Sequence, residues 1–447
     1  MNKVGLTFKG GIHPPHHKEQ TENKAIEIAP VPKEVVIPLV QHIGAPCEPV
    51  VKVGDYVKVG QLIGEAKAFV SAPIHASVSG TVKKIEKRPS PGGARINSVV
   101  IATDGEQTIH ESIVPKGKLE DLSVDELKII IKNSGITGMG GAGFPTHVKV
   151  SPPQDKKIDL LIINGAECEP FLTSDHRVML EMPDRIINGT RAIMKALDVD
   201  KAIIGIESNK PDAIKVIKKA VIDFPDITVA ELRTKYPQGG EKSLIYAVSK
   251  KEVPSGGLPM DVGVVVQNIG TVVAISNAIE TGMPLVERVV TVTGSAVKEP
   301  KNLMVKIGTS FKDAIDFCGG YSEELGKLIN GGPMMGIAQY TDAVPIIKGT
   351  SGILVLNKHD SVPPDPTNCI RCAKCIHGCP VYLQPLMISK NSLLGRFAEA
   401  EAYNAMDCIE CGICSFVCPA KIPLVDSIRM AKKEIVEKRK KSEGVKG

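Results

Sequence analysis

One cysteine phrase occurs twice near the end of this chain and decides how its last domain folds. Residues 369–379 read Cys-Ile-Arg-Cys-Ala-Lys-Cys-Ile-His-Gly-Cys, and residues 408–418 read Cys-Ile-Glu-Cys-Gly-Ile-Cys-Ser-Phe-Val-Cys. A proline follows each run, so both share the pattern Cys-x2-Cys-x2-Cys-x3-Cys-Pro. Three thiolates at this spacing let a tight loop wrap one face of a metal cluster, and the fourth ligand must come from elsewhere. The sequence therefore predicts two linked metal centres.

This spacing is that of bacterial ferredoxins with two [4Fe-4S] clusters, in which the fourth cysteine of each run ligates the other cluster. The predicted ligands of cluster 1 are Cys369, Cys372, Cys375 and Cys418, and those of cluster 2 are Cys379, Cys408, Cys411 and Cys414. Structural zinc favours paired Cys-x2-Cys knuckles instead. Disulfides fit poorly with a chain that lacks a secretory signal.

Length and charge restrict the remaining possibilities. A chain of 447 residues is expected to form about three or four domains, and 43% hydrophobic residues with 23% charged residues are typical of a globular protein. No apolar run reaches the ~18 residues that cross a bilayer. The first residues form no signal peptide, which predicts a cytoplasmic protein with reduced thiols.

The net charge of +5 is concentrated in the tail, where residues 429–447 hold eight Lys or Arg and three Glu. Two interpretations stay open for this basic tail: a solvated helix end, or a segment that binds anionic lipid or an acidic partner. The body of the chain gives no indication of nucleic-acid binding.

The first hundred residues predict an irregular arm and a small β domain. Three histidines near the start, His13, His16 and His17, stand among prolines with no carboxylate or thiol nearby, so a metal site is not the preferred interpretation. Short β-runs and glycine turns between residues 34 and 101 resemble the barrel-sandwich fold of biotinyl and lipoyl carrier domains. Residues 69–71 replace the modified lysine of those domains, and Lys67 lacks its flanking pattern, so we expect a docking or packing module.

A dense glycine cluster follows a predicted helix that begins with the capping box of residues 123–126. Residues 138–149 read Gly-Met-Gly-Gly-Ala-Gly-Phe-Pro-Thr-His-Val-Lys. A helix precedes this run where a Rossmann fingerprint needs a strand. Without Cβ atoms the backbone still approaches a flat or anionic ligand closely, and Lys149 neutralises phosphate charge. The alternative is a flexible linker, which would be richer in serine.

Four segments in order resemble the flavin subunit of respiratory complex I. They are the glycine run, the Asn164-Gly-Ala-Glu-Cys-Glu-Pro segment, the turn at 236–242 and the Val-Gln-Asn-Ile-Gly-Thr segment at 266–271. The resemblance implies non-covalent FMN and NAD(H), with cofactor contacts from Gly138, Gly140, Gly141, Ala142, Gly143, Phe144, Lys149, Asn164, Glu167, Glu169, Glu241 and Asn268. Met139, Gly240 and Lys242 depart from the family pattern.

Within this resemblance, Phe144, Glu167 and Glu169 are expected nearest the hydride transfer. Phe144 would stack on a ring, and the two glutamates would orient NADH. Another interpretation makes Glu167, Glu169 and Asp175 ordinary acids at a helix N-terminus. The excess of carboxylates favours NADH over NADPH, because a carboxylate repels a 2′-phosphate.

The remaining segments predict one more domain before the cysteines. Strands at 159–164, 201–206 and 227–233, with a helix at 211–222, indicate a largely parallel sheet. Residues 285–340 resemble a ligand-binding β-grasp unit, with a helix at 311–318 and a structural glycine turn at 330–336. Cys47, Cys168 and Cys318 lack metal spacing. Residues 363–366 form a stiff proline linker, and residues 391–405 predict a helix within a mainly helical ferredoxin module.

Taken together, the order of segments resembles the RnfC family of Rnf complexes, which are ion-translocating ferredoxin:NAD oxidoreductases. We expect a multidomain α/β and α+β chain with five parts: a barrel-sandwich (lipoyl-like) domain with its arm at 1–110, a complex I flavin-subunit-like α/β domain at 111–284, a β-grasp (SLBB-like) domain at 285–345, a sheet return, linker and helical two-cluster ferredoxin domain at 346–428, and a basic tail at 429–447.

This resemblance implies a peripheral subunit on the cytoplasmic side of the cell membrane. It would pass electrons between NAD(H), FMN and two clusters, with integral membrane and iron–sulfur subunits as partners and ferredoxin as an indirect one. The alternatives are a cobalamin reductase of the propanediol-utilisation type and a non-catalytic iron–sulfur electron wire.

Overall fold

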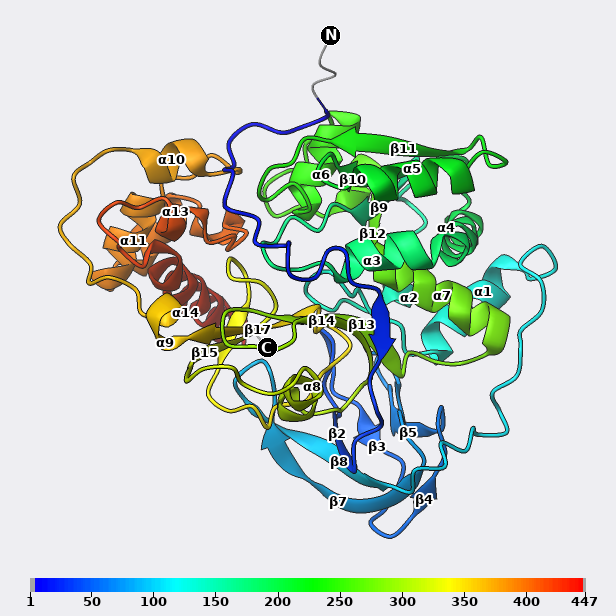
Figure 1. Ribbon diagram of the computed structural model, residues 1–447. Coiled ribbons are helices and arrows are strands. Elements are labelled where there is room, and N and C mark those ends of the chain that lie inside the picture. The colour runs from blue at the N-terminus through cyan, green and yellow to red at the C-terminus, as the bar shows by residue number, and fades with distance from the viewer. Residues whose placement is uncertain (1–4, 445–447) are drawn as a thin grey trace.

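The computed structural model describes residues 5–444, which form four bodies joined by an N-terminal arm (Figure 1). The first four residues of the predicted arm and the last three of the basic tail lie outside the described residues. Within residues 5–444, no helix combines the length and the apolar character that spanning a membrane requires.

A parallel sheet forms the centre of the predicted flavin domain. Its strand order is β11-β10-β9-β12, and every neighbouring pair is parallel. The strands are β9 (Leu160–Gly165), β10 (Ala202–Glu207), β11 (Ile227–Leu232) and β12 (Val264–Asn268). Each has an apolar β-branched run because both faces of the sheet are covered by helices. The predicted strand positions are confirmed.

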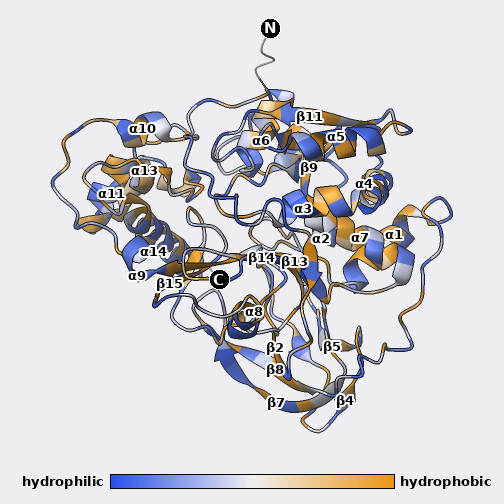
Figure 2. Ribbon diagram, in the orientation of Figure 1, coloured by the Kyte–Doolittle hydropathy of each residue, from blue (hydrophilic) through white to orange (hydrophobic). Residues whose placement is uncertain are grey.

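Helices cover the two faces of this sheet unequally. Leu161 and Ile163 belong to the larger core with α1 (Val124–Asn133), α4 (Pro183–Leu197), α5 (Pro211–Ala220) and α7 (Ile269–Thr281). Ile162, on the other face, packs with α6 (Glu241–Ser249). The helices accordingly carry both hydrophobic and hydrophilic residues (Figure 2). A short α3 (Ser174–Glu181) and η1 (Pro259–Val262) complete the domain.

The capping box predicted for the first helix is present. The Ser123 side chain accepts from the Glu126 amide, and the Glu126 carboxylate accepts from the Ser123 amide. The turn after this helix contains Gly135 at φ +63°, where a Cβ would lie 2.2 Å from the Pro73 carbonyl oxygen. The capping box therefore sets the start of α1, and the turn at Gly135 sets its end.

The small β domain has two antiparallel sheets around its own core. One sheet has the order β2-β8-β7-β4 and the other β3-β5-β6. The strands are β2 (Glu34–Pro38), β3 (Glu48–Pro49), β4 (Tyr56–Val57), β5 (Leu62–Glu65), β6 (Ile74–His75), β7 (Gly80–Pro89) and β8 (Arg95–Thr103). Val35, Ile37, Ile63 and Val82 are fully buried between them.

The predicted β-grasp unit is a mixed six-stranded sheet that takes strands from beyond its expected limits. Its order is β1-β14-β13-β17-β15-β16, with α8 (Phe311–Phe317) packed on it. The strands are β1 (Ile26–Ile28), β13 (Glu287–Thr293), β14 (Lys301–Lys306), β15 (Leu325–Asn330), β16 (Ile337–Gln339) and β17 (Gly352–Asn357). The arm thus contributes β1, and β17 is the sheet return that follows residue 345.

The C-terminal module is mainly helical, as predicted. It contains α9 (Lys358–Ser361), α10 (Lys374–Gly378), α11 (Pro385–Leu393), α12 (Phe397–Ala402), η2 (Ala405–Asp407), α13 (Ile413–Phe416) and α14 (Leu424–Gly444). The expected single helix over 391–405 is wrong: Gly395 at φ +69° separates α11 from α12. The break lets both short helices pack against α14.

The N-terminal arm runs between the flavin domain and the cysteine module before it joins the β-grasp sheet (Figure 1). Leu6 and Ile12 form bridges with Leu232 and Tyr236 of the flavin domain. The Gly11 amide donates to the Gly378 carbonyl at 2.9 Å. The arm therefore contacts the flavin domain, the cysteine module and the β-grasp sheet. Its composition alone does not predict these contacts.

Candidate functional site

The glycine loop is a hairpin between α1 and α2 (Thr146–Lys149). Thr137 pairs with Pro145, and the Gly138 amide donates to the Phe144 carbonyl at 2.9 Å. A Cβ on Gly140 would lie 2.6 Å from the Asn268 side-chain nitrogen, whereas a Cβ on Gly141 would meet no described atom within 4 Å. One face of the loop therefore rests on the sheet domain and the other face is open.

Two asparagines at the carboxyl edge of the parallel sheet lie beneath this loop. Asn164 and Asn268 are direct partners in the register of β9 and β12. Asn164 Nδ2 donates to the Gly239 carbonyl at 2.8 Å, and Asn268 Nδ2 donates to Asp175 Oδ2 at 2.7 Å. Ligands of open α/β sheets bind at this edge.

Lys149 reaches the same edge from α2. Its Nζ lies 2.9 Å from Glu241 Oε1 and 3.2 Å from the Val266 carbonyl oxygen. Both side chains of this ion pair are partly exposed. The structure thus brings the predicted residues of the glycine loop, Asn164, Asn268, Lys149 and Glu241 into one region, and Phe144 is half-buried beside them.

These residues fit a flat, phosphate-bearing cofactor. The backbone at Gly140, Gly141 and Ala142 is exposed, and no atom of residues 5–444 occupies the space where a Gly141 side chain would extend. Next to Gly239, the buried Gln238 has no hydrogen-bond partner within the described residues for either side-chain polar atom. A cationic amine beside an open glycine backbone suits a phosphate group.

Glu167 caps a helix in this structure. Its carboxylate accepts from the Asp175 amide at 2.6 Å and from the His176 amide at 3.2 Å, at the start of α3. Burial and the charge of Glu167 raise the pKa of Asp175 to about 7. Glu167 therefore caps α3, and Asp175 lies in the first turn of that helix.

Glu169 faces the glycine turn of the β-grasp unit. Its carboxylate accepts from the amides of Met334 at 3.1 Å and Met335 at 2.8 Å. Burial raises the pKa of Glu169 to about 7. The turn at 330–336 thus packs against the segment that follows β9.

Two buried lysines hold the segment that follows β9. The sequence did not predict this role for either of them. Lys18 of the arm donates to the carbonyls of Glu167 and Glu169 at 3.0 Å, and also to that of Leu172. Lys210 donates to the Ala166 carbonyl at 2.7 Å. Burial lowers the pKa of Lys18. No local pattern distinguishes either residue from a surface lysine.

The two cysteine loops have the same backbone. Arg371 and Glu410 both have positive φ, at 55° and 56°, and each amide donates to the sulfur of the first cysteine of its run at 3.4 Å. Ala373 and Gly412 repeat the left-handed conformation two residues later. Amide hydrogen bonds to cysteine sulfur are among the interactions that tune iron–sulfur clusters. The sequence repeat is therefore also a structural repeat.

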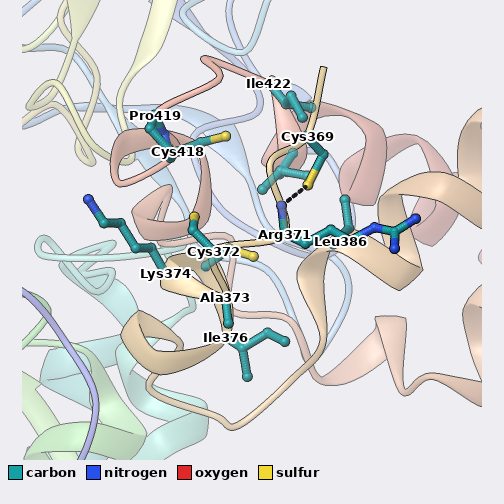
Figure 3. A pocket seen from close by; sticks show the side chains of 12 residues that line it. Cys369, Arg371, Cys372, Ala373, Lys374, Ile376, Leu386, Cys418, Pro419 and Ile422 are labelled. Carbon is teal, nitrogen blue, oxygen red and sulfur yellow. Dashed lines mark hydrogen bonds between the residues drawn. The ribbon is translucent and has the colours of Figure 1, made fainter. Parts of the chain in front are cut away.

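The four cysteines assigned to cluster 1 line one hollow. It measures about 180 Å³, and Cys369, Cys372, Cys375 and Cys418 are among its lining residues. The labelled side chains of Cys369, Cys372 and Cys418 turn toward one another (Figure 3). A single zinc ion would draw four sulfurs to about 2.3 Å from one point, whereas an iron–sulfur cubane needs room between its ligands. The hollow provides that room.

The four cysteines assigned to cluster 2 are more deeply placed. Cys379, Cys411 and Cys414 are buried, and Cys408 is half-buried. Burial, with the charges of neighbouring cysteines in this set, raises the pKa of Cys411 and Cys414 to about 12. Buried thiols with such high pKa values become thiolates when a metal binds them.

Cys47, Cys168 and His17 make packing contacts. Cys168 accepts from the Gly239 amide at 3.3 Å, and Cys47 donates to the Ala72 carbonyl at 3.2 Å. His17 stacks on Phe171 with ring centroids 4.7 Å apart.

The barrel-sandwich domain supports the glycine loop from behind. The Ile43 amide donates to the Gly143 carbonyl at 3.3 Å, and His147 Nε2 lies 3.0 Å from the Phe69 carbonyl oxygen. Lys67, the counterpart of the carrier lysine, forms an exposed ion pair with Glu48. This geometry agrees with a docking or packing module.

Four known domain families match this chain in the order that the fold shows. The RnfC barrel sandwich hybrid domain matches residues 6–106, the Nuo51 FMN-binding domain residues 131–277, the SLBB domain residues 289–338 and the 4Fe-4S dicluster domain residues 362–419. The chain is 51% identical to the C subunit of the Na(+)-translocating ferredoxin:NAD(+) oxidoreductase complex of Acetobacterium woodii, over 99% of this chain and 100% of that protein.

The chain belongs to the RnfC family of ion-translocating ferredoxin:NAD oxidoreductase complexes. A second relative, the C subunit of the proton-translocating complex of Clostridium ljungdahlii, is 53% identical over 96% of this chain and 94% of its own length. An NAD+-reducing [NiFe]-hydrogenase crystal structure shares the fold at a TM-score of 0.50 and 16% identity, over 70% of this chain and 62% of that chain. The predicted family and the four-part architecture are confirmed.

Proposed function

We propose that this RnfC protein exchanges electrons between NAD(H) and the other subunits of a membrane-bound, ion-translocating complex. The observation that carries the proposal is the open glycine loop, which rests on the carboxyl edge of a parallel sheet in the same chain as two cysteine loops of ferredoxin spacing. An FMN-binding domain and a dicluster domain in one polypeptide supply the parts for this reaction.

The chemistry requires a converter between electron pairs and single electrons. When held on the glycine loop, FMN would supply the conversion between hydride transfer and single-electron transfer, and each [4Fe-4S] cluster would carry one electron. The protein positions these groups and sets their electrostatics. No acid–base side chain is needed for the hydride transfer itself.

For FMN, we propose contacts from Gly138, Gly140, Gly141, Ala142 and Gly143, with the Lys149 amine on the phosphate. Asn164, Asn268 and Glu241 border the same opening. Phe144 would stack against a flavin or nicotinamide ring. Glu167 and Glu169 act through position, since their carboxylates hold α3 and the 330–336 turn in place.

For the clusters, we propose the crosswise ligand sets described above, with Cys418 in cluster 1 and Cys379 in cluster 2. The hollow lined by Cys369, Cys372, Cys375 and Cys418 supports the first set. The packing of Cys379, Cys408 and Cys414 in one buried cluster supports the second.

We further propose that the protein lies at the cytoplasmic side of the membrane, where NADH and ferredoxin are available. Ion translocation then belongs to the integral membrane partners. Relatives of nearly equal identity carry names that specify sodium and protons, so overall similarity does not assign the ion.

The flavin site is tested by Gly141→Val. Because no described atom lies within 4 Å of a Cβ at this position, the valine side chain should leave the fold undisturbed and obstruct only a ligand on the loop. We expect anaerobically purified variant protein to lose FMN and NADH-dependent dye reduction and to keep its iron content.

Gly92→Val is the matched control, because Gly92, like Gly141, has no positive φ, a Cβ there also meets no described atom within 4 Å, and it lies in the barrel-sandwich domain. It should retain FMN. Full FMN content in Gly141→Val would contradict the proposed site, and natural protein with iron but no flavin would favour the electron-wire alternative.

A further inference from the structure

The two cysteine pockets have different surroundings. Among the described residues, those that line the hollow of cluster 1 all belong to the cysteine module and lie within 369–376, at Leu386 and within 418–424. Cys369 and Cys372 are exposed, and the neighbouring Ile370 is 70% exposed. Cluster 1 therefore lies toward the outside of the molecule.

The loop of cluster 2 contacts the flavin domain directly. The Tyr236 hydroxyl donates to the Cys411 carbonyl at 2.8 Å, and Tyr236 is only 1% exposed. The Ser255 hydroxyl donates to the carboxylate of Asp407, the residue before Cys408, at 2.7 Å. Both donors come from the flavin domain and both acceptors from the cluster 2 loop.

The turn that begins at Tyr236 also contacts the flavin edge of the sheet. Gly239 accepts from Asn164 at 2.8 Å and donates to Cys168 at 3.3 Å. Two residues further on, Glu241 pairs with Lys149. One turn therefore connects the proposed FMN contacts to the backbone of a cluster 2 ligand.

Apolar packing surrounds the contact between Tyr236 and Cys411. Tyr236, Cys411 and Ile413 form a buried cluster, against which Cys168 and Met334 also pack. Met334 belongs to the turn held by Glu169, and its carbonyl oxygen lies 2.6 Å from where a Cβ on Gly412 would be. Packed protein of this kind holds two cofactor sites at a fixed separation.

The arm closes the other side of cluster 2. Gly11 donates to the Gly378 carbonyl, and Gly10, at φ +73°, lies against the Cys379 carbonyl. Each cysteine segment assigned to cluster 2 thus contacts another part of the molecule.

We propose that cluster 2 exchanges electrons directly with the flavin, and that cluster 1 is the outer cluster and meets partner subunits. Tyr236 is the positioning residue that holds cluster 2 against the flavin domain. The proposal rests on the proposed function. In the NADH-oxidising direction, NADH becomes NAD+, a proton is released, and two electrons pass singly through cluster 2 and then cluster 1, each cluster being reduced and reoxidised by one electron at a time.

Two cysteine variants test the order. Cys369→Ala removes a cluster 1 ligand, and Cys379→Ala removes a cluster 2 ligand. We expect electron paramagnetic resonance of Cys369→Ala to show the remaining cluster reduced by NADH. In Cys379→Ala, dithionite should reduce the remaining cluster, and the NADH-reduced signal should be lost.

The reverse pattern would overturn the proposal, as would reduction of the remaining cluster by NADH in Cys379→Ala at the natural rate. The natural chain separates this failure from failure of the proposed function. If NADH reduces neither cluster in the natural chain, the electron-transfer function is itself wrong.

Tyr236→Phe tests the positioning role and stays informative if a cysteine variant fails to fold. The ring is kept, and the hydroxyl is lost together with its hydrogen bond to the Cys411 carbonyl and its interaction with Glu169. We expect a shifted midpoint potential and altered resonance of cluster 2, an unchanged cluster 1, unchanged iron and FMN content, and slower reduction by NADH. Tyr321→Phe, whose hydroxyl bonds Asp342 in the β-grasp unit, is the control. Unchanged cluster 2 properties in Tyr236→Phe would refute the role of Tyr236.

Discussion

At the scale of single residues, a buried amine joins three parts of this chain. Lys348 is 1% exposed, and its Nζ donates to the Pro73 carbonyl at 2.8 Å and to the Gly135 carbonyl at 2.6 Å. Pro73 belongs to the barrel-sandwich domain and Gly135 to the turn before the glycine loop. Burial lowers the pKa of Lys348 to about 7.

This pKa predicts a pH-dependent stability. Between pH 7 and the ordinary lysine pKa, the unfolded chain binds a proton at Lys348 that the folded chain does not, so folding becomes more favourable as pH rises. Lys348→Met has no such group. We expect the difference in Tm between the natural chain and this variant to grow in favour of the natural chain from pH 7 to pH 10.

The same measurement between pH 5 and 6.5 is the control, because Lys348 is protonated there in both states. A constant difference in Tm over pH 7–10 would mean that Lys348 is charged when buried.

At the scale of elements, α3 depends on a carboxylate that lies outside it. Glu167 precedes the helix by several residues and still accepts from its first amides. Loss of a capping acceptor costs ~0.5–2 kcal/mol of helix stability. We expect Glu167→Ala to speed hydrogen exchange at the α3 amides, and Glu167→Gln to preserve much of their protection because it keeps one acceptor oxygen.

Equal protection of α3 in natural protein and Glu167→Ala would contradict the capping role. A loss of NADH binding in Glu167→Gln with α3 fully protected would instead support a direct contact with the nicotinamide nucleotide.

Most of the site elements were predictable because their signals are local. The cysteine spacing, the capping box at Ser123 and the buried strand that ends at Asn164 each depend on neighbours in sequence. Lys18 and Lys348 were not predictable, since what buries each of them is a set of carbonyls from distant segments. The break at Gly395 was not predicted, because the residues around it favour a helix and one glycine does not outweigh their propensity.

At the scale of the whole molecule, the arm should determine how firmly the cysteine module is held. A Cβ on Gly10 would lie 2.7 Å from the Cys379 carbonyl oxygen, at φ +73°. We expect Gly10→Ala to increase hydrogen exchange in residues 374–379 and to slow the reduction of both clusters by NADH.

Gly93→Ala is matched to this variant, because Gly93 also has positive φ, at 84°, and a Cβ there meets no described atom within 4 Å. Both variants strain the backbone, and only Gly10→Ala presses on a neighbour. Equal hydrogen exchange at residues 374–379 in Gly10→Ala and Gly93→Ala would show that the arm does not hold the cysteine module.

The order of the domains was predictable from sequence and their mutual contacts were not. Each domain has its own core, and its pattern of apolar residues marks it. Contacts such as Tyr236 with Cys411 join residues that no periodicity relates. The proposed path of electrons through the molecule therefore depends on contacts between domains, which the sequence does not predict.

The path of the arm also has a consequence for biogenesis. Gly10 and Gly11 leave the ribosome early, and their partners Gly378 and Cys379 leave it late. The contact between the arm and the cysteine module forms only after the module has been synthesised, because contacts between distant segments form late in folding. We therefore expect the assembly machinery to deliver iron and sulfide to an open cysteine module, and the arm to seal cluster 2 as the last step of maturation.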